Sequence, residues 1–307
     1  MINELKQEAM LHGDKLQVIP IKRLQSIKNE IDVFKENEDL NGFQNWIVND
    51  LYKFEVPMLE FTIKSIILIA VPHPAYANVE LTRQGKKYNV LSLAASDIDN
   101  TEKYLKDFLV TKKFHIEGTS SLPMKRLAAQ SGLAVYGRNN ICYVEGMGSC
   151  FSFVAYFSDI PFDNDEWTEM RHAETCTKCK VCLNNCPTGA IRAERFLIDN
   201  ERCLSYFNEM AAEFPQWIPK SAHHCIYDCL KCQIKCPMNK EYVNNVIGPI
   251  KFSEDETEML MQGRTYDEFS PELKQKSNLL GLHRWPDGIP KNLRVLFELS
   301  ESQEIIV

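Results

Sequence analysis

The sequence has no apolar run long enough to cross a membrane. Its longest run, residues 63–72, is interrupted by Lys64, whereas a membrane-spanning helix needs about 20 apolar residues. The first residues mix charges and lack an apolar core, so no secretory signal is visible. We therefore expect a cytoplasmic protein in which residues 63–72 form a buried strand.

Low-complexity segments and an excess of positive charge are also absent. The chain has 35 Lys and Arg against 42 Asp and Glu, a formal net charge of −7, which argues against a large nucleic-acid surface but not against a local basic patch. A hydrophobic fraction of 44% and a charged fraction of 25% are typical of a soluble globular protein. The length of 307 residues allows one large domain or two ordinary ones.

Cysteine, by contrast, is plentiful, with 11 residues. One run has spacings of two, two and three intervening residues and ends in Cys-Pro: Cys176, Cys179, Cys182 and Cys186. Bacterial ferredoxins hold iron–sulfur clusters with this spacing, and in two-cluster ferredoxins the fourth cysteine binds the other cluster. The run therefore predicts a second set of cysteine ligands elsewhere in the chain.

A second group of cysteines follows about fifty residues later and also ends in Cys-Pro. Its candidates are Cys203, Cys225, Cys229, Cys232 and Cys236. A zinc knuckle or scattered buried thiols is the alternative, but zinc sites typically use four ligands in two pairs. Two complete runs favour two [4Fe-4S] clusters, and either Cys203 or Cys225 completes the second site.

Two features before the cysteines are typical of ligand loops. His73 lies between two prolines at the end of the predicted buried strand, where ligand loops commonly lie in mixed α/β domains, although a lone histidine is more often a structural turn residue. Gly146 and Gly148 separate two apolar runs. Paired glycines let the backbone approach a ligand closely, and an ordinary hairpin is the alternative.

Five segments within about residues 119–240 resemble the epoxyqueuosine reductases, a cobalamin-dependent family related to the reductive dehalogenases. They are GLAVYGRN, GSCFSFVAYFSDIPF, CTKCKVCLNNCPTGAI, LIDNERCLSYF and IYDCLKCQIKCPMNK. The resemblance implies an α/β (α+β) fold with a nitroreductase-like corrinoid-binding domain at residues 1–165. It further implies a two-[4Fe-4S] ferredoxin-like domain at residues 166–245 and a C-terminal helical segment at residues 246–307 that packs on the core.

The resemblance also implies how the cluster ligands divide. One cluster would be held by Cys176, Cys179, Cys182 and Cys236. The other would be held by Cys186, Cys203, Cys229 and Cys232. The close match of ERCLSYF favours Cys203 over Cys225 as the ligand.

The resemblance further suggests residues for the corrinoid and for proton transfer. The candidates for corrinoid contact are His73, Gly137, Asn139, Gly146, Gly148, Ser149 and Cys150. Where the family carries an acidic proton donor, this chain reads IEGTSSLP, with Glu117 the nearest acid. Reductive dehalogenases use a tyrosine beside a basic residue, so Tyr136 or Tyr88 with Arg138 is the analogous catalytic set. A tyrosine that only packs on a ring is the alternative.

The sequence thus predicts an oxidoreductase in which two [4Fe-4S] clusters deliver electrons to cobalamin. Its substrate would be a small molecule or carried on tRNA, either epoxyqueuosine or a different compound. A low-potential donor such as ferredoxin or flavodoxin would supply electrons to the protein. The alternative is an electron-transfer partner that reduces a corrinoid held on another protein. A third reading is a plain ferredoxin-type module fused to a structural domain.

Overall fold

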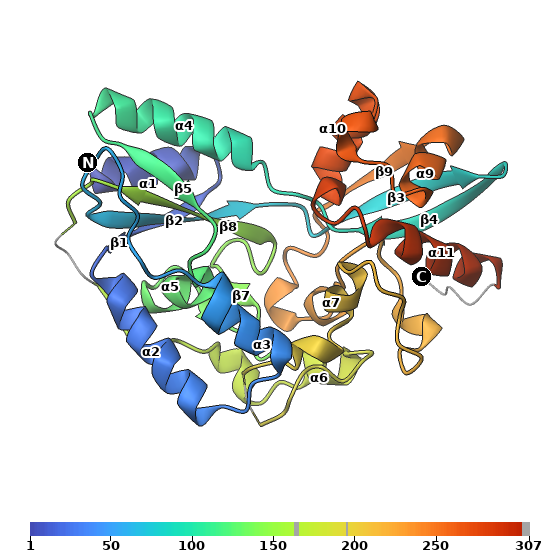
Figure 1. The fold of residues 1–307 in the computed structure, drawn as a ribbon, viewed down its shortest axis with the longest axis horizontal. Helices are drawn as coiled ribbons and strands as arrows, with labels where there is room; N and C mark the ends of the chain where they lie inside the picture. Colours follow the sequence, from blue (N-terminus) through green and yellow to red (C-terminus); the bar gives the residue numbers. More distant parts are fainter. Residues whose placement is uncertain (163–165, 195, 303–307) are drawn as a thin grey trace. The chain divides into compact units, whose positions relative to one another are not determined.

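The computed structural model describes residues 1–162, 166–194 and 196–302. The chain forms two compact units, neither continuous in sequence (Figure 1). The first consists of Met1–Pro72 and Ser96–Cys179, and the second of His73–Ala95 and Lys180–Val307. In the described ranges, no helix is both long enough and apolar enough to span a membrane.

The first unit is built on an antiparallel four-stranded sheet. Its strand order is β1 (Lys15–Pro20), β2 (Ser65–Pro72), β8 (Phe151–Ser158) and β5 (Ile116–Thr119). The predicted buried strand is confirmed as β2, and every residue from Ser65 to Val71 is buried. Its apolar run has no alternation with polar residues because both faces of the sheet are covered.

Helices cover the two faces of this sheet (Figure 1). Ile67 and Ile69 of β2 pack against residues of α1 and α4, while Ile66 and Leu68 pack against residues of α2 and α5. Successive strand residues point to opposite faces, which explains this division. The helices are α1 (Ile2–Leu11), α4 (Ile98–Thr111), α2 (Arg23–Asn37) and α5 (Met124–Gln130).

Shorter elements complete the first unit. They are α3 (Gly42–Trp46), the π-helix η1 (Ile47–Leu51), the paired strands β6 (Val135–Tyr136) and β7 (Cys142–Tyr143), and the 3-10 helix η2 (Glu174–Thr177). An asparagine side chain caps α3 in a capping box, with Asn41 accepting from the Gln44 N–H. Helix α3 therefore begins at Gly42 and is followed directly by the single π-type turn η1.

The second unit contains a three-stranded sheet in the order β4 (Lys86–Ser92), β3 (Tyr76–Arg83) and β9 (Val246–Phe252). Because β9 pairs in parallel with β3, residues 73–95 join the C-terminal half of the chain. This division does not coincide with the predicted domain boundaries near residues 165 and 245. Residue 165 itself lies outside the described residues.

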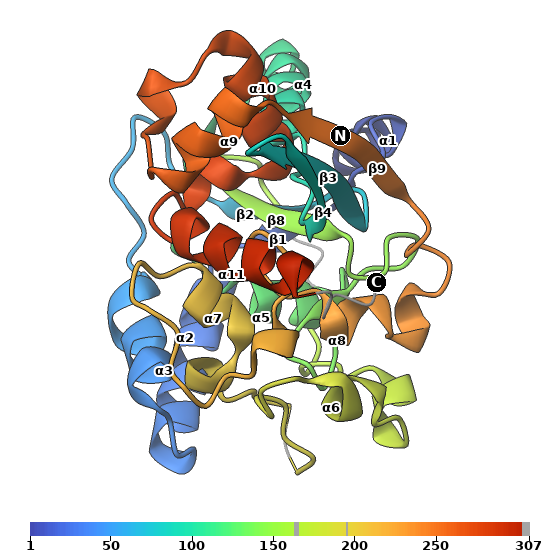
Figure 2. The same cartoon turned by 90° about the vertical axis from the view of Figure 1, so that its right-hand side faces the viewer.

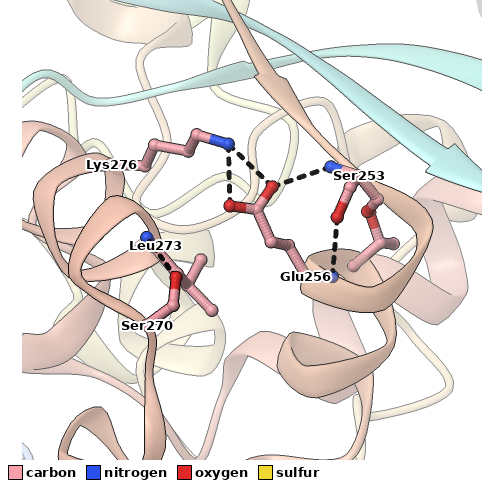
Figure 3. Close-up of polar contacts among 6 residues, drawn as sticks. Ser253, Glu256, Ser270, Leu273 and Lys276 are labelled. Carbon is pink, nitrogen blue, oxygen red and sulfur yellow. Dashed lines mark hydrogen bonds and ion pairs between the residues drawn. The ribbon is translucent and has the colours of Figure 1, made fainter.

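The helices α9 (Glu254–Met261), α10 (Pro271–Leu280) and α11 (Ile289–Glu301) lie beside this sheet (Figure 2) and share its apolar core. A capping box starts α9, since Ser253 and Glu256 each accept the other's backbone N–H (Figure 3). Lys276 also donates to both oxygens of Glu256, at 2.8 and 2.7 Å. This ion pair joins α9 to α10.

The remaining elements of the second unit are short turns, most of them in the cysteine-rich segment. The α-helical turns are α6 (Val181–Asn185), α7 (Leu204–Asn208) and α8 (Lys231–Ile234). The 3-10 turns are η3 (Asn200–Arg202), η4 (Lys220–Ala222), η5 (Pro237–Asn239), η6 (Tyr266–Glu268) and η7 (Leu282–Arg284).

Candidate metal centre

Short helical turns present the predicted ligands of the second unit. Cys186 directly follows α6, Cys203 directly precedes α7, and Cys232 lies within α8. The turns α6 and α8 pack against each other. The ends of such short turns leave backbone N–H groups that are not used inside a helix, and these can donate to sulfur.

Three of the four cysteines predicted for the second cluster lie near one another. Burial raises the pKa of Cys203, and the nearby Cys186 raises it further. Burial raises the pKa of Cys229 to about 12, with Cys203, Asp228 and Cys186 adding to the effect. Partly buried thiols with raised pKa values, such as Cys203 and Cys229, need a cationic partner to become thiolates, and iron ions are such a partner. The donor set therefore fits an iron–sulfur cluster.

Backbone donors are directed at the same three sulfurs. The N–H of Ala190 donates to the Sγ of Cys186 over 3.3 Å. The N–H groups of Ser205 and Lys231 donate to the other two sulfurs. Hydrogen bonds to sulfur tune the reduction potential of an iron–sulfur cluster, so this environment suits electron transfer as well as metal binding.

The surroundings of Cys203 and Cys225 differ. Cys225 is 2% exposed and forms a β-bridge with Leu91 of β4, so its backbone is part of the second unit's sheet. Its pKa is raised well above the usual value, mainly by burial and then by Cys229. Cys186 is among the groups that raise the pKa of Cys203. The choice of Cys203 over Cys225 as the fourth ligand stays a prediction.

The other predicted ligand set is divided by the fold. Cys176 and Cys179 belong to the first unit, and Cys182 and Cys236 belong to the second, so this set stays a prediction. Within the described ranges, no three His, Cys, Asp or Glu side chains are arranged to hold a single metal ion. A cubane cluster has a different iron for each of its four thiolates, so its ligands do not converge on one ion.

In the first unit, the β6–β7 hairpin holds the segment that leads to Cys176. Tyr136 pairs with this segment, donating its N–H to Arg171 over 2.8 Å and accepting from the N–H of Ala173 at 2.9 Å. The guanidinium of Arg138 donates to the carbonyl of Cys176 over 2.9 Å. Arg138, predicted as a catalytic partner, therefore also anchors the backbone of a predicted cluster ligand.

Two predicted corrinoid contacts are internal parts of this hairpin. A Cβ at Gly137 would lie 2.6 Å from Cε2 of Tyr143, so only glycine fits there. Asn139 is 4% exposed and donates its Nδ2 to the Tyr143 hydroxyl over 2.9 Å. Contacts with Tyr143 inside the hairpin explain why glycine and asparagine stand at these two positions. Their presence therefore does not by itself point to a ligand.

Tyr136 has partners of its own. Its hydroxyl donates to Oδ1 of Asn140 over 2.7 Å, and burial raises its pKa while Arg126 lowers it. The ring of His172 lies edge-on at 6.4 Å between centroids. Sequence reasoning missed Arg126 and His172 because neither lies in a motif, and only the fold brings them near Tyr136.

The glycine turn at residues 146–148 closes a tight loop. Both Gly146 and Gly148 have positive φ, at 77° and 59°, and the N–H of Val144 donates to the Gly148 carbonyl over 2.8 Å. Met147 points into the core that faces α2 and α5. Because Met147 points inward, the neighbouring positions of the turn that could face a ligand are the two glycines, Gly146 and Gly148.

Ser149 and Cys150, which follow this turn, are both buried, with exposed fractions of 5% and 9%. Burial raises the pKa of the Cys150 thiol to about 11. Cys150 is therefore a protonated thiol at neutral pH, as expected for a cysteine that binds no metal.

Two further predicted residues belong to the second unit. Nδ1 of His73 lies 2.6 Å from the carbonyl oxygen of Pro74, so that nitrogen is turned toward its own backbone. Tyr88 is 5% exposed, packs on Phe297 with ring centroids 4.5 Å apart, and donates to Glu301 over 2.8 Å. Burial and Glu301 raise the pKa of Tyr88, so it occupies the core of its unit.

Two hollows of the first unit lie away from most of the predicted site. The larger, of about 630 Å³, is lined by residues of α1 and β1 and by part of residues 161–167, and none of the predicted site residues lines it. The smaller, of about 450 Å³, is lined in part by Glu117, Lys106 and His115. Glu117, the acid nearest to the family's proton donor, is exposed on β5.

Comparison with known families bears on the cysteine-rich region first. Residues 175–239 match a family described as a 4Fe-4S double cluster binding domain. This confirms the prediction of iron–sulfur binding at the level of the domain. The matched range includes all eight predicted cysteine ligands.

The chain resembles the epoxyqueuosine reductases. An epoxyqueuosine reductase of Bacillus anthracis is 24% identical over 255 residues, which are 77% of this chain and 65% of that protein. The chain thus spans just under two thirds of the length of this relative. This similarity confirms the predicted resemblance to the epoxyqueuosine reductases, which are oxidoreductases.

Solved structures support the fold. An epoxyqueuosine reductase from Bacillus subtilis superposes with a TM-score of 0.62 at 17% identity, over 97% of this chain and 82% of that one. Another, crystallised with an epoxyqueuosine-modified tRNA-Tyr stem loop, gives a TM-score of 0.61 at 20% identity with the same coverage. The chain therefore has the mixed α/β fold of these enzymes, including a 4Fe-4S binding domain.

Proposed function

We propose that this chain is an epoxyqueuosine reductase-like oxidoreductase in which two [4Fe-4S] clusters deliver electrons to a cobalamin. The observation that carries the proposal is the partly buried group of Cys186, Cys203 and Cys229 with a backbone hydrogen bond at each sulfur. Such a site binds a cluster and sets its potential. We place this activity in the cytoplasm.

In this proposal the ligands divide between the clusters as the family resemblance implies. The first cluster takes Cys176, Cys179, Cys182 and Cys236. The second takes Cys186, Cys203, Cys229 and Cys232. The fourth cysteine of the first run, Cys186, thereby joins the other cluster, as in two-cluster ferredoxins.

The residues proposed to hold the corrinoid are those of the glycine turn, Gly146, Gly148, Ser149 and Cys150, with His73 from the second unit. Small side chains and left-handed glycines suit close approach of a flat, bulky ligand to the backbone. When bound, cobalamin would supply low-valent cobalt as the reductant. Gly137 and Asn139 would contribute by keeping the β6–β7 hairpin in shape.

For proton transfer we propose Tyr136, supported by Arg138 on the same hairpin, with Tyr88 as the second candidate. A phenol has an ordinary pKa of about 10 and donates readily only when a cation or a developing anion assists it. Burial raises the pKa of Tyr136 overall, and Arg126 is the cation whose charge opposes this increase. The absence of the family's aspartate in IEGTSSLP is the reason to seek a donor elsewhere.

The substrate class is an epoxyqueuosine on tRNA or a related small molecule. A relative was crystallised with an epoxyqueuosine-modified tRNA stem loop, which supports the tRNA-borne form. The altered loop GLAVYGRN and the missing aspartate support a different substrate. A ferredoxin or flavodoxin would supply electrons, since low-potential clusters need a donor of similar potential.

The second candidate function is a partner protein that reduces a corrinoid held on another polypeptide. The observation that favours it is the internal use of Gly137 and Asn139, whose side-chain requirements are met within the hairpin. Such a protein would keep both clusters and need no corrinoid site of its own.

The test begins with anaerobic purification and measurement of iron, acid-labile sulfide and bound cobalt. We expect about eight irons per chain, from two four-iron clusters, and a change in the visible spectrum when cobalamin is titrated in. Iron without cobalamin binding would overturn the corrinoid part and support the partner protein. Cobalamin binding without turnover on epoxyqueuosine-tRNA would exclude that substrate.

A further inference from the structure

Asp228 has a backbone conformation that is unusual for its residue type. Its φ is +62°, in the left-handed region that favours glycine and is strained for most other residues. Aspartate tolerates this region when its short side chain forms local hydrogen bonds. The position directly before Cys229 is therefore one where the side chain has a reason to be present.

The side chain of Asp228 joins the two segments that carry second-cluster ligands. One of its oxygens, Oδ1, accepts from the backbone N–H of Cys229 at 2.8 Å. The same oxygen accepts from the hydroxyl of Ser205, two residues beyond Cys203. The carboxylate is thus fixed beside both ligands by donors from each segment.

Further hydrogen bonds hold this arrangement. The Nδ2 of Asn208 donates to the carbonyl of Asp228. From α11, the Nδ2 of Asn292 donates over 2.8 Å to the carbonyls of both Asn208 and Ile226. The position of the carboxylate relative to the two cysteines is therefore set by the fold and not by a mobile side chain.

The negative charge of Asp228 lies next to both ligand segments. Its Oδ1 is held by the N–H of Cys229 and by the hydroxyl of Ser205, so the charge has a fixed place beside Cys229 and near Cys203. Among the ion pairs of the described residues, none neutralises Asp228. A fixed, unneutralised charge in partly buried surroundings acts more strongly than one in water.

We propose that the Asp228 carboxylate lowers the reduction potential of the cluster held by Cys186, Cys203, Cys229 and Cys232. Reduction of a [4Fe-4S] cluster adds one electron and breaks no bond, so the added charge is opposed by a nearby carboxylate. Net charge around a cluster is among the factors that set its potential. The proposal rests on the two-cluster function proposed above.

The test is a redox titration of the anaerobically purified, iron-loaded full chain, followed by electron paramagnetic resonance. In Asp228→Asn we expect one of the two clusters to become easier to reduce. At a fixed potential its ratio of reduced to oxidised form should rise at least tenfold, which is about 59 mV for one electron. The other cluster should titrate as in the wild type.

Two further variants separate charge from structure. Asp228→Gly removes the charge and suits the left-handed backbone, so it should fold and show the same change as Asp228→Asn. Asp228→Glu keeps the charge and should stay near the wild-type potential. As a matched control, Asp267→Asn removes an exposed carboxylate of the same unit and should change neither cluster.

The outcomes are distinct from those of the proposed function. Wild-type protein without iron would refute the two-cluster function itself. Eight irons per chain with unchanged potentials in Asp228→Asn and Asp228→Gly would overturn the role of Asp228 and leave the two-cluster function standing. If the potential also changes in Asp228→Glu, which keeps the charge, the effect comes from packing, and the proposed role of the charge is overturned.

Discussion

Cys203 and Tyr136 both belong to predicted sites, yet their surroundings differ. Around Cys203, the neighbouring thiol Cys186 and a backbone donor act directly on the sulfur. Around Tyr136, the partners act on the loop: its hydroxyl donates to Asn140 and its backbone pairs with residues 171–173. The groups around Cys203 act on the sulfur that would bind a cluster. The groups around Tyr136 hold the hairpin in its own conformation.

The difference follows from how each chemistry is encoded. A cluster requires thiolates at short, fixed spacings along the chain, so its ligands form a motif. A corrinoid contact requires only a backbone or a small side chain in the right place, and many sequences meet that requirement. Fold similarity at 17–20% identity extends to the whole chain but does not identify such contacts.

The largest expected effect tests the cysteine side of this comparison. Cys203→Ala should remove one cluster, about four of about eight irons per chain, because it deletes the thiol that neighbours both Cys186 and Cys229. Cys225→Ala should retain the iron, because that residue serves the bridge to Leu91. Iron and sulfide analysis of both variants after anaerobic purification is the measurement, and the reverse pattern would make Cys225 the ligand.

Local patterns predicted several parts of the fold. The uninterrupted apolar run at β2 and the Ser253–Glu256 capping box depend on neighbours within one segment, and both are found in the structure. The segment after Cys203 is different, since α7 has only five residues. The carbonyl groups at the end of α7 and just after it accept hydrogen bonds from a residue of α11, about eighty positions later in the sequence.

That residue is Lys291, and no pattern in the sequence indicates its role. It is 2% exposed, and its Nζ donates to the carbonyls of Phe207, Met210 and Ala212 over 2.6, 2.6 and 2.8 Å. A lysine on an amphipathic helix is normally expected in solvent. Its burial depends on pairing between distant segments, as does the joining of residues 73–95 to β9.

The hairpin side of the comparison can be tested at Gly137. Gly137→Ala should cost roughly 1–3 kcal/mol of stability, because the new Cβ would lie 2.6 Å from Tyr143 and 3.1 Å from the Ile141 carbonyl. Gly118→Ala is the matched control, since its Cβ would meet Tyr156 only at 3.8 Å. Thermal unfolding and cobalamin titration are both measured. Weaker cobalamin binding at an unchanged unfolding temperature would instead place Gly137 at the corrinoid.

The smallest expected effect concerns Glu209, which follows α7 near Asp228. Burial, and then Asp228, raise the pKa of Glu209 to about 8, so between its usual value and about pH 8 the folded state binds more protons than the unfolded chain. Stability should therefore fall as pH rises from about 5 to 8. Glu209→Gln should remove this slope, while the exposed Glu241→Gln should keep it. Unfolding midpoints across that pH range provide the measurement. Equal slopes in wild type and Glu209→Gln would mean that the Glu209 carboxyl is already ionised at neutral pH. Asp228 would then have a charged neighbour beside the second cluster.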